Sequence, residues 1–157
     1  MPLVWRLVRP AFARDLDGEG SRITGGRWNR RGKAVVYTSS HLSLSVLETY
    51  VHLPSELRED LPEMEAVSIR IPEGAGSTKV TAERFDVLMT APDPYATCQS
   101  VGDDWFTRGA DLALEVPSVL VPEETNVVLN ALHPAMREVR IVASRTFRFD
   151  PRLSARH

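Results

Sequence analysis

Cysteine is almost absent from this chain of 157 residues, in which Cys98 is the only example. A single cysteine cannot form a disulfide within the chain, and a tetrahedral zinc site built on cysteine would lack ligands. The four histidines fall at no metal-ligand spacing, so we expect no bound metal. A single cysteine without a disulfide partner is typical of a protein from a reducing cytosol.

Long apolar segments are absent as well. No stretch approaches the roughly 18 apolar residues that a membrane-spanning helix needs. The N-terminal segment also lacks the apolar run of a secretory signal. The sequence therefore predicts a cytoplasmic protein.

Lysine is scarce too, since Lys33 and Lys79 are the only lysines among 19 basic residues. The others are arginines, whose planar guanidinium suits phosphates and carboxylates. The formal net charge of −2 provides no overall attraction to nucleic acid or to anionic lipid. The composition therefore weighs against a nucleic-acid module or a ribonuclease.

The local pattern is mostly that of β-strands, in a single domain covering residues 1–157. We expect strands at residues 4–7, 34–38, 66–71, 113–121, 126–129 and 139–149. Helices are predicted at 42–52 and 102–109, a long loop at 14–33 and a turn at 73–77. Pro92 and Pro94 favour a loop in the segment 82–101. Strands and helices without regular alternation predict an α+β fold.

Glu48 interrupts an apolar face of the predicted helix 42–52. Leu44, Leu47, Glu48 and Val51 fall at positions i, i+3, i+4 and i+7, which is the spacing of one helical face. A carboxylate on such a face is costly unless it is paired or faces a cleft. Two interpretations stay open: a glutamate at the stripe edge paired with an arginine, and a functional carboxylate.

Ser118 interrupts a strand face in the same way. Counting by twos, one face of the predicted strand carries Leu112, Leu114, Val116, Ser118 and Leu120. A serine that bonds to nearby backbone and a functional hydroxyl both explain the interruption.

The segment 24–33, TGGRWNRRGK, combines glycine with positive charge. Gly25 and Gly26 allow the backbone to approach a ligand closely. The positive charge comes from Arg27, Arg30, Arg31 and Lys33. The residue order is not that of a phosphate-binding P-loop. A phosphate-binding loop and a solvated basic turn both stay open, and Trp28 suits either packing or stacking on a base.

Taken in order, the motifs WR, GGRWNRRGKAVVYTSS, SLSVLE, LEVPSVLVPEETNVVLN, HP and FRFDPRL resemble the RES domain family. The resemblance runs from about residue 4 to residue 153, and the tract 72–101 carries little of it. The Arg, Glu and Ser that name the family fall on Arg27, Glu48 and Ser118. Its first-strand Arg falls on Arg6 and its second-strand Tyr on Tyr37.

The resemblance implies a fold similar to that of ADP-ribosyltransferase toxins, with mixed β-sheets and a few helices around an NAD cleft. It also implies a bacterial toxin that consumes NAD+ by hydrolysis or phosphorolysis, or that transfers ADP-ribose to a protein. An Xre-type antitoxin is the implied partner. A non-catalytic interaction protein is the remaining alternative.

The chemistry assigns a role to each implied residue. Cleavage of the nicotinamide–ribose bond builds positive charge on the ribose, which Glu48 would stabilise. Arg27 and Arg6 would anchor the diphosphate or ribose, and Tyr37 would pack on the nicotinamide side. The expected catalytic residues are Arg27, Tyr37, Glu48 and Ser118, and the expected NAD+-binding residues are these four with Arg6 and Asn126. Ser118 would fix the ribose or nicotinamide, and Asn126 would support the site.

Overall fold

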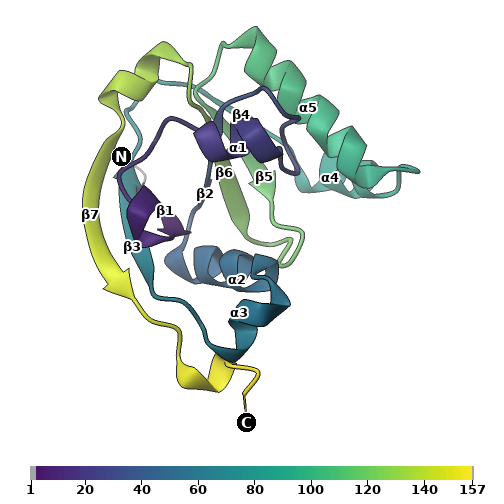
Figure 1. Cartoon of the computed structure of the whole chain (residues 1–157). Coiled ribbons are helices and arrows are strands. Elements are labelled where there is room, and N and C mark those ends of the chain that lie inside the picture. Colours follow the sequence, from purple (N-terminus) through teal and green to yellow (C-terminus); the bar gives the residue numbers. More distant parts are fainter. Residues whose placement is uncertain (1–2, 157) are drawn as a thin grey trace.

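A computed structural model describes residues 3–156. Within these residues, seven strands form one sheet, and five α-helices lie around it (Figure 1). The strands are β1 Leu3–Val8, β2 Val35–Ser39, β3 Met64–Arg70, β4 Ser77–Lys79, β5 Ala113–Pro117, β6 Thr125–Asn130 and β7 Arg140–Phe147. The helices are α1 Glu19–Thr24, α2 Leu42–His52, α3 Ser55–Glu59, α4 Ala82–Met89 and α5 Pro94–Arg108. The α+β prediction is confirmed.

The strands run in the order β4-β5-β6-β2-β1-β3-β7. The β4–β5 pair is parallel and the other pairs are antiparallel. The β1–β2 pairing rests on one residue pair, Trp5 with Ser39, whereas β2 and β6 pair over five residues. The sheet is therefore least firmly joined in its middle, between β1 and β2.

Apolar side chains cover both faces of the sheet, because successive strand residues point to opposite sides. On one face, Val35 of β2 packs with Phe85 of α4 and Trp105 of α5. On the other face, Val36 belongs to a separate cluster with Ile69 of β3. A third cluster packs α2 onto β1 and β3.

The prediction of a loop at 82–101 is wrong, because α4 and most of α5 lie there. Thr81 caps α4 by accepting a hydrogen bond from the Arg84 N–H. Pro94 occupies the first turn of α5, where a missing N–H costs nothing, and Asp93 caps this helix. The predicted helix 102–109 is the second half of α5.

Two other predicted segments also need correction. The loop 14–33 contains α1, which is bounded by glycines with left-handed backbone, Gly18 and Gly25. The predicted strand 113–121 ends at Pro117, because the Ser118 hydroxyl accepts hydrogen bonds from two backbone N–H groups further on and turns the chain. Strand β4 and helix α3 were not predicted.

Between residues 3 and 156, no helix combines the length and apolar character needed to cross a membrane.

Candidate functional site

The carboxylate of Glu48 accepts two hydrogen bonds on the same oxygen. The Ser118 hydroxyl and the Asn126 side-chain amide each donate to Glu48 Oε1 at 2.8 Å. These residues come from α2, from the turn after β5 and from β6. Within residues 3–156, the other oxygen, Oε2, accepts no hydrogen bond, and Glu48 is only partly buried. Oε1 is thus fixed by two donors, whereas Oε2 has no hydrogen-bond donor among the described residues.

The Ser118 hydroxyl has no capacity left for a ligand. A hydroxyl donates one proton and accepts at two lone pairs. Ser118 donates to Glu48 and accepts from the backbone N–H groups of Leu120 and Val121, at 3.1 and 3.2 Å. The residue is only 1% exposed. The interpretation of this serine as one that bonds to nearby backbone is confirmed. Its hydroxyl also donates to Glu48, and a functional role for it stays a prediction.

Asn126 is itself oriented by a buried serine that sequence reasoning missed. The Ser39 hydroxyl donates to Asn126 Oδ1 at 2.7 Å, which turns the amide nitrogen toward Glu48. Ser39 and Asn126 are direct partners in the β2–β6 pairing. Ser39 thus donates to Asn126, and Asn126 donates to Glu48.

The predicted apolar stripe around Glu48 is not a core stripe. Leu47 and Val51 are 38% and 40% exposed, and Leu44 alone of the stripe is buried. The packed side of α2 instead carries Leu42, Val46 and Tyr50, which lie with Leu53, just after the helix, against the cluster on β1 and β3. Among the described residues Glu48 forms no ion pair with an arginine, so the paired-glutamate interpretation is wrong.

The Tyr37 hydroxyl is held by the arginine loop, which we define as residues 25–33. It donates to Asn29 Oδ1 at 2.6 Å and accepts from the Trp28 N–H at 3.0 Å. Burial raises the pKa of the Tyr37 phenol, and the Trp28 hydrogen bond opposes the rise. A Cβ on Gly26 would lie 2.6 Å from the phenol oxygen, so glycine is needed here for close approach to tyrosine.

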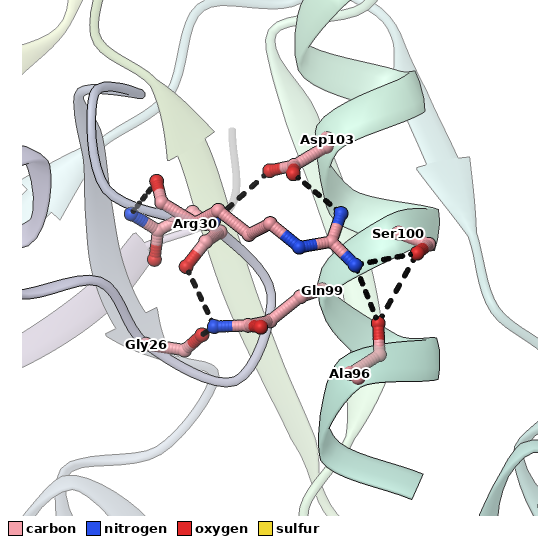
Figure 2. A network of polar contacts seen from close by, with 7 residues as sticks. Gly26, Arg30, Ala96, Gln99, Ser100 and Asp103 are labelled. Carbon is pink, nitrogen blue, oxygen red and sulfur yellow. Dashed lines mark hydrogen bonds and ion pairs between the residues drawn. The ribbon is translucent and has the colours of Figure 1, made fainter. Parts of the chain in front are cut away.

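The arginines of this loop differ in their contacts. The Arg27 guanidinium lies 5.3 Å from the centre of the Tyr95 ring. Arg30 is paired with Asp103 of α5, at 3.0 Å (Figure 2). Trp28 is buried beside Phe85, so the packing interpretation of this tryptophan is confirmed. Arg27 is the loop arginine that combines partial burial with the absence, within residues 3–156, of a carboxylate partner.

The register of β2 relates the loop to the Glu48 group. Tyr37 and Ser39 are two residues apart on this strand, so their side chains lie on the same face, about 7 Å apart. Tyr37 contacts the loop beside Arg27, and Ser39 contacts Asn126 beside Glu48. The two groups therefore occupy neighbouring parts of one sheet face. In the described chain no hydrogen bond or ion pair joins Arg27 directly to Glu48.

Arg6 stands apart from both groups. Its guanidinium donates to the backbone oxygen of Asp15 at 2.6 Å. Burial lowers the pKa of Arg6, and the carboxylates of Asp15 and Asp17 oppose this. Strand alternation places Arg6 on the face of β1 opposite Trp5, the residue that pairs with Ser39. Its predicted role in NAD+ binding stays a prediction.

A cavity lined by other residues lies on the chain as well. It measures about 410 Å³, is open to solvent and includes His133 and Arg137 in its lining. None of the predicted site residues lines it. Between residues 3 and 156, no cluster of three or more His, Cys, Asp or Glu side chains is placed to hold a metal ion.

The family model for the RES domain matches residues 3–150. The chain belongs to the RES domain family. This RES domain is 37% identical over 155 residues to the Prs ADP-ribosylating toxin of Sphingobium sp. (strain YBL2), which covers 95% of the chain and 94% of the relative. It is 34% identical over 153 residues to Toxin Res of Yersinia enterocolitica serotype O:8, with 96% and 99% covered.

A solved structure supports the fold. The RES domain matches a chain of the M. tuberculosis MbcT–MbcA toxin–antitoxin complex with a TM-score of 0.70. The match covers 92% of this chain and 83% of the other, at 18% identity, and it shows a shared fold. The predicted family and the predicted fold are both confirmed.

Proposed function

We propose that this RES domain is the toxin of a bacterial toxin–antitoxin pair and that it cleaves the nicotinamide–ribose bond of NAD+. Cleavage would deplete NAD+ in the cell and arrest growth. The proposal is supported by the family, by the toxin names of two relatives and by the chemistry of the Glu48 group.

One observation carries the proposal: a carboxylate fixed through one oxygen while the other is left open. When the glycosidic bond breaks, its electron pair leaves with nicotinamide, which becomes neutral, and positive charge develops on the ribose carbon. A carboxylate held in advance stabilises such charge without having to reorganise. Glu48, with Oε1 held by Ser118 and Asn126, supplies this negative charge through Oε2.

Arg27 and Tyr37 bind and orient the substrate. Arg27 is a half-buried cation without a carboxylate partner in the described residues, which suits the diphosphate of NAD+. Tyr37 has its hydroxyl tied to the loop and its ring partly exposed, which suits contact with the nicotinamide ring. Arg6 would be a second anchor for phosphate or ribose.

Ser118 acts through Glu48 in this proposal and does not touch substrate, because its hydrogen-bonding capacity is filled. Asn126 also acts through Glu48, and the Ser39 hydroxyl orients the Asn126 amide. This assignment replaces the direct contact with ribose or nicotinamide that the sequence suggested for Ser118.

The acceptor of the ADP-ribosyl group distinguishes two activities. Water or inorganic phosphate gives a glycohydrolase or phosphorylase, in which an acceptor oxygen bonds to the ribose carbon and releases its proton. A protein side chain gives an ADP-ribosyltransferase. The 37% identity to a relative named Prs ADP-ribosylating toxin supports ADP-ribosyl transfer as the second candidate activity. An Xre-type antitoxin would bind the toxin and hold it inactive.

The test is mass spectrometry of NAD+ incubated with purified, antitoxin-free protein. Three conditions are needed: buffer alone, added phosphate, and added cell extract. Free nicotinamide with ADP-ribose indicates hydrolysis, ADP-ribose 1″-phosphate indicates phosphorolysis, and a modified protein indicates transfer. Intact NAD+ in all three conditions would overturn the proposal.

A further inference from the structure

The segment 72–101 carries little of the family resemblance, yet it supplies most of helix α5, and α5 holds the arginine loop. Ala96, Gln99, Ser100 and Asp103 fall at i, i+3, i+4 and i+7, so they share one face of this helix. Each of the four bonds to the loop (Figure 2). One face of α5 therefore contacts a single loop that lies more than sixty residues earlier in the chain.

Asp103 and Arg30 form the strongest part of this contact. The Asp103 carboxylate accepts from the Arg30 backbone N–H through Oδ1 and from the guanidinium through Oδ2, both at 3.0 Å. The same guanidinium donates to the Ala96 carbonyl at 3.2 Å and to the Ser100 hydroxyl at 2.8 Å. Asp103 is buried, and charge-assisted bonds are about twice as strong as neutral ones. The Arg30 guanidinium is therefore held on α5 by three residues of that helix.

The contact continues on both sides of Arg27. The Gln99 amide donates to the Gly26 carbonyl at 3.0 Å and to the Asn29 carbonyl at 3.3 Å. Helix and loop also touch at Gly102, where a Cβ would lie 1.7 Å from the Trp28 carbonyl oxygen. The residues before and after Arg27 are thus fixed against α5.

Arg27 itself differs from Arg30. Its guanidinium lies over the Tyr95 ring, which belongs to α5 and is 46% exposed. Arg27 forms no ion pair with a carboxylate in residues 3–156, whereas Arg30 has one. The helix holds the backbone and one side of the guanidinium and leaves the charge unneutralised.

We propose that Asp103 and Gln99 of α5 are positioning residues for Arg27, which they hold in place to bind the diphosphate of a dinucleotide. This rests on the proposed function. A cation placed in advance binds phosphate without the cost of ordering a loop. We call Asp103 and Gln99 the clamp. The clamp affects substrate binding more than turnover, because the hydrogen bonds of Glu48 come from other elements.

The test measures binding of ADP-ribose, which contains the diphosphate and cannot release nicotinamide. Calorimetry compares wild type with Asp103→Asn, with Gln99→Met, and with Asp104→Asn as the matched control. Asp104 is the exposed neighbour on the same helix. We expect about tenfold weaker binding for each clamp variant, because Arg27 would lose part of its charge-assisted contact with the diphosphate. Binding by the control should be unchanged. Nicotinamide release from NAD+ should show a raised KM with kcat nearly unchanged.

A double-mutant cycle with Arg27→Ala separates positioning from a general structural role. If Asp103 acts through Arg27, Asp103→Asn weakens ADP-ribose binding much less in the Arg27→Ala background. An equal loss in both backgrounds would overturn the inference, as would wild-type affinity in both clamp variants.

Hydrogen exchange provides a readout that does not depend on NAD+. Amide protection of residues 26–30 should fall in Asp103→Asn and stay unchanged in Asp104→Asn. Unchanged protection in Asp103→Asn would also overturn the inference. A wild-type protein that leaves NAD+ intact overturns the proposed function together with this inference. A wild-type protein that cleaves NAD+ but binds no ADP-ribose, or whose binding is unaffected in both clamp variants, overturns the inference alone.

Discussion

Replacing Ser118 with alanine tests whether this serine acts through Glu48. The change removes one of two donors to Glu48 Oε1 and keeps the other, from Asn126. A hydrogen bond to a charged group contributes about 1.5–3 kcal/mol. Because one donor remains, we expect a loss near the lower limit, which is about a tenfold fall in kcat. KM should change little, since the Ser118 hydroxyl is fully used within the protein.

The same substitution also affects stability. The N–H groups of Leu120 and Val121 lose their acceptor, and water replaces it in part because Leu120 is 38% exposed. We expect a decrease of about 1 kcal/mol in the free energy of unfolding, measured in urea. Kinetics of nicotinamide release, measured well below the unfolding transition, give kcat and KM. Ser55→Ala, at the start of α3, is the control. A raised KM with wild-type kcat would mean that Ser118 contacts the substrate and would refute the reasoning.

Three further substitutions test the arginine loop and the residues that contact it. Tyr37→Phe should reduce the free energy of unfolding by about 1–3 kcal/mol. Because the folded-state pKa of Tyr37 is raised, the contribution of its hydroxyl to wild-type stability is complete below pH ~10 and is lost at higher pH. Urea unfolding of the two proteins should therefore differ at neutral pH and converge above pH ~10. Gly102→Ala should cost about 1–3 kcal/mol through overpacking, whereas Gly20→Ala, which has open space, should not destabilise; thermal unfolding compares them. Arg27→Ala should weaken ADP-ribose binding about tenfold or more in calorimetry, with Arg31→Ala as the exposed control, and equal affinities would contradict its role.

The strands of the sheet were largely predictable from local pattern. The apolar runs in β2, β3 and β6 are short and bounded by polar or turn residues, so a strand is the structure they favour. Helix 42–52 was predicted with its observed bounds. Its buried side was not, because α2 packs onto β1 and β3 with a different side, and an apolar residue such as Leu47 stays exposed.

The α4–α5 region was mispredicted because proline is compatible both with a loop and with the first turn of a helix. Pro94 disrupts the interior of a helix but suits its first turn, and only the cap that Asp93 provides decides between them. The polar face of α5 was visible as spacing, with Gln99 and Asp103 four residues apart. Its partner was not, since Asp103 and Arg30 are separated by 73 residues.

Glu48, Ser118 and Asn126 were predictable as site residues, but the hydrogen bonds that join them were not. The family pattern named Glu48 and Ser118, and the odd placement of each in an apolar stretch pointed to them independently. Ser39 gave no such signal, because a serine at the end of a strand is ordinary. Its role depends on pairing with Asn126 in β6, which only the sheet register reveals.

In the proposed function the Glu48 carboxylate drives cleavage, and nicotinamide release from NAD+ by wild type and Glu48→Gln tests this role. The amide keeps the shape and removes the charge, so both proteins should unfold at similar urea concentrations. Glu56→Gln on α3, an exposed glutamate, is the control. We predict release by wild type and by Glu56→Gln, and at least a hundredfold slower release by Glu48→Gln, which is about the cost of removing one stabilising group from a preorganised site. Wild-type rates in folded Glu48→Gln would contradict the account.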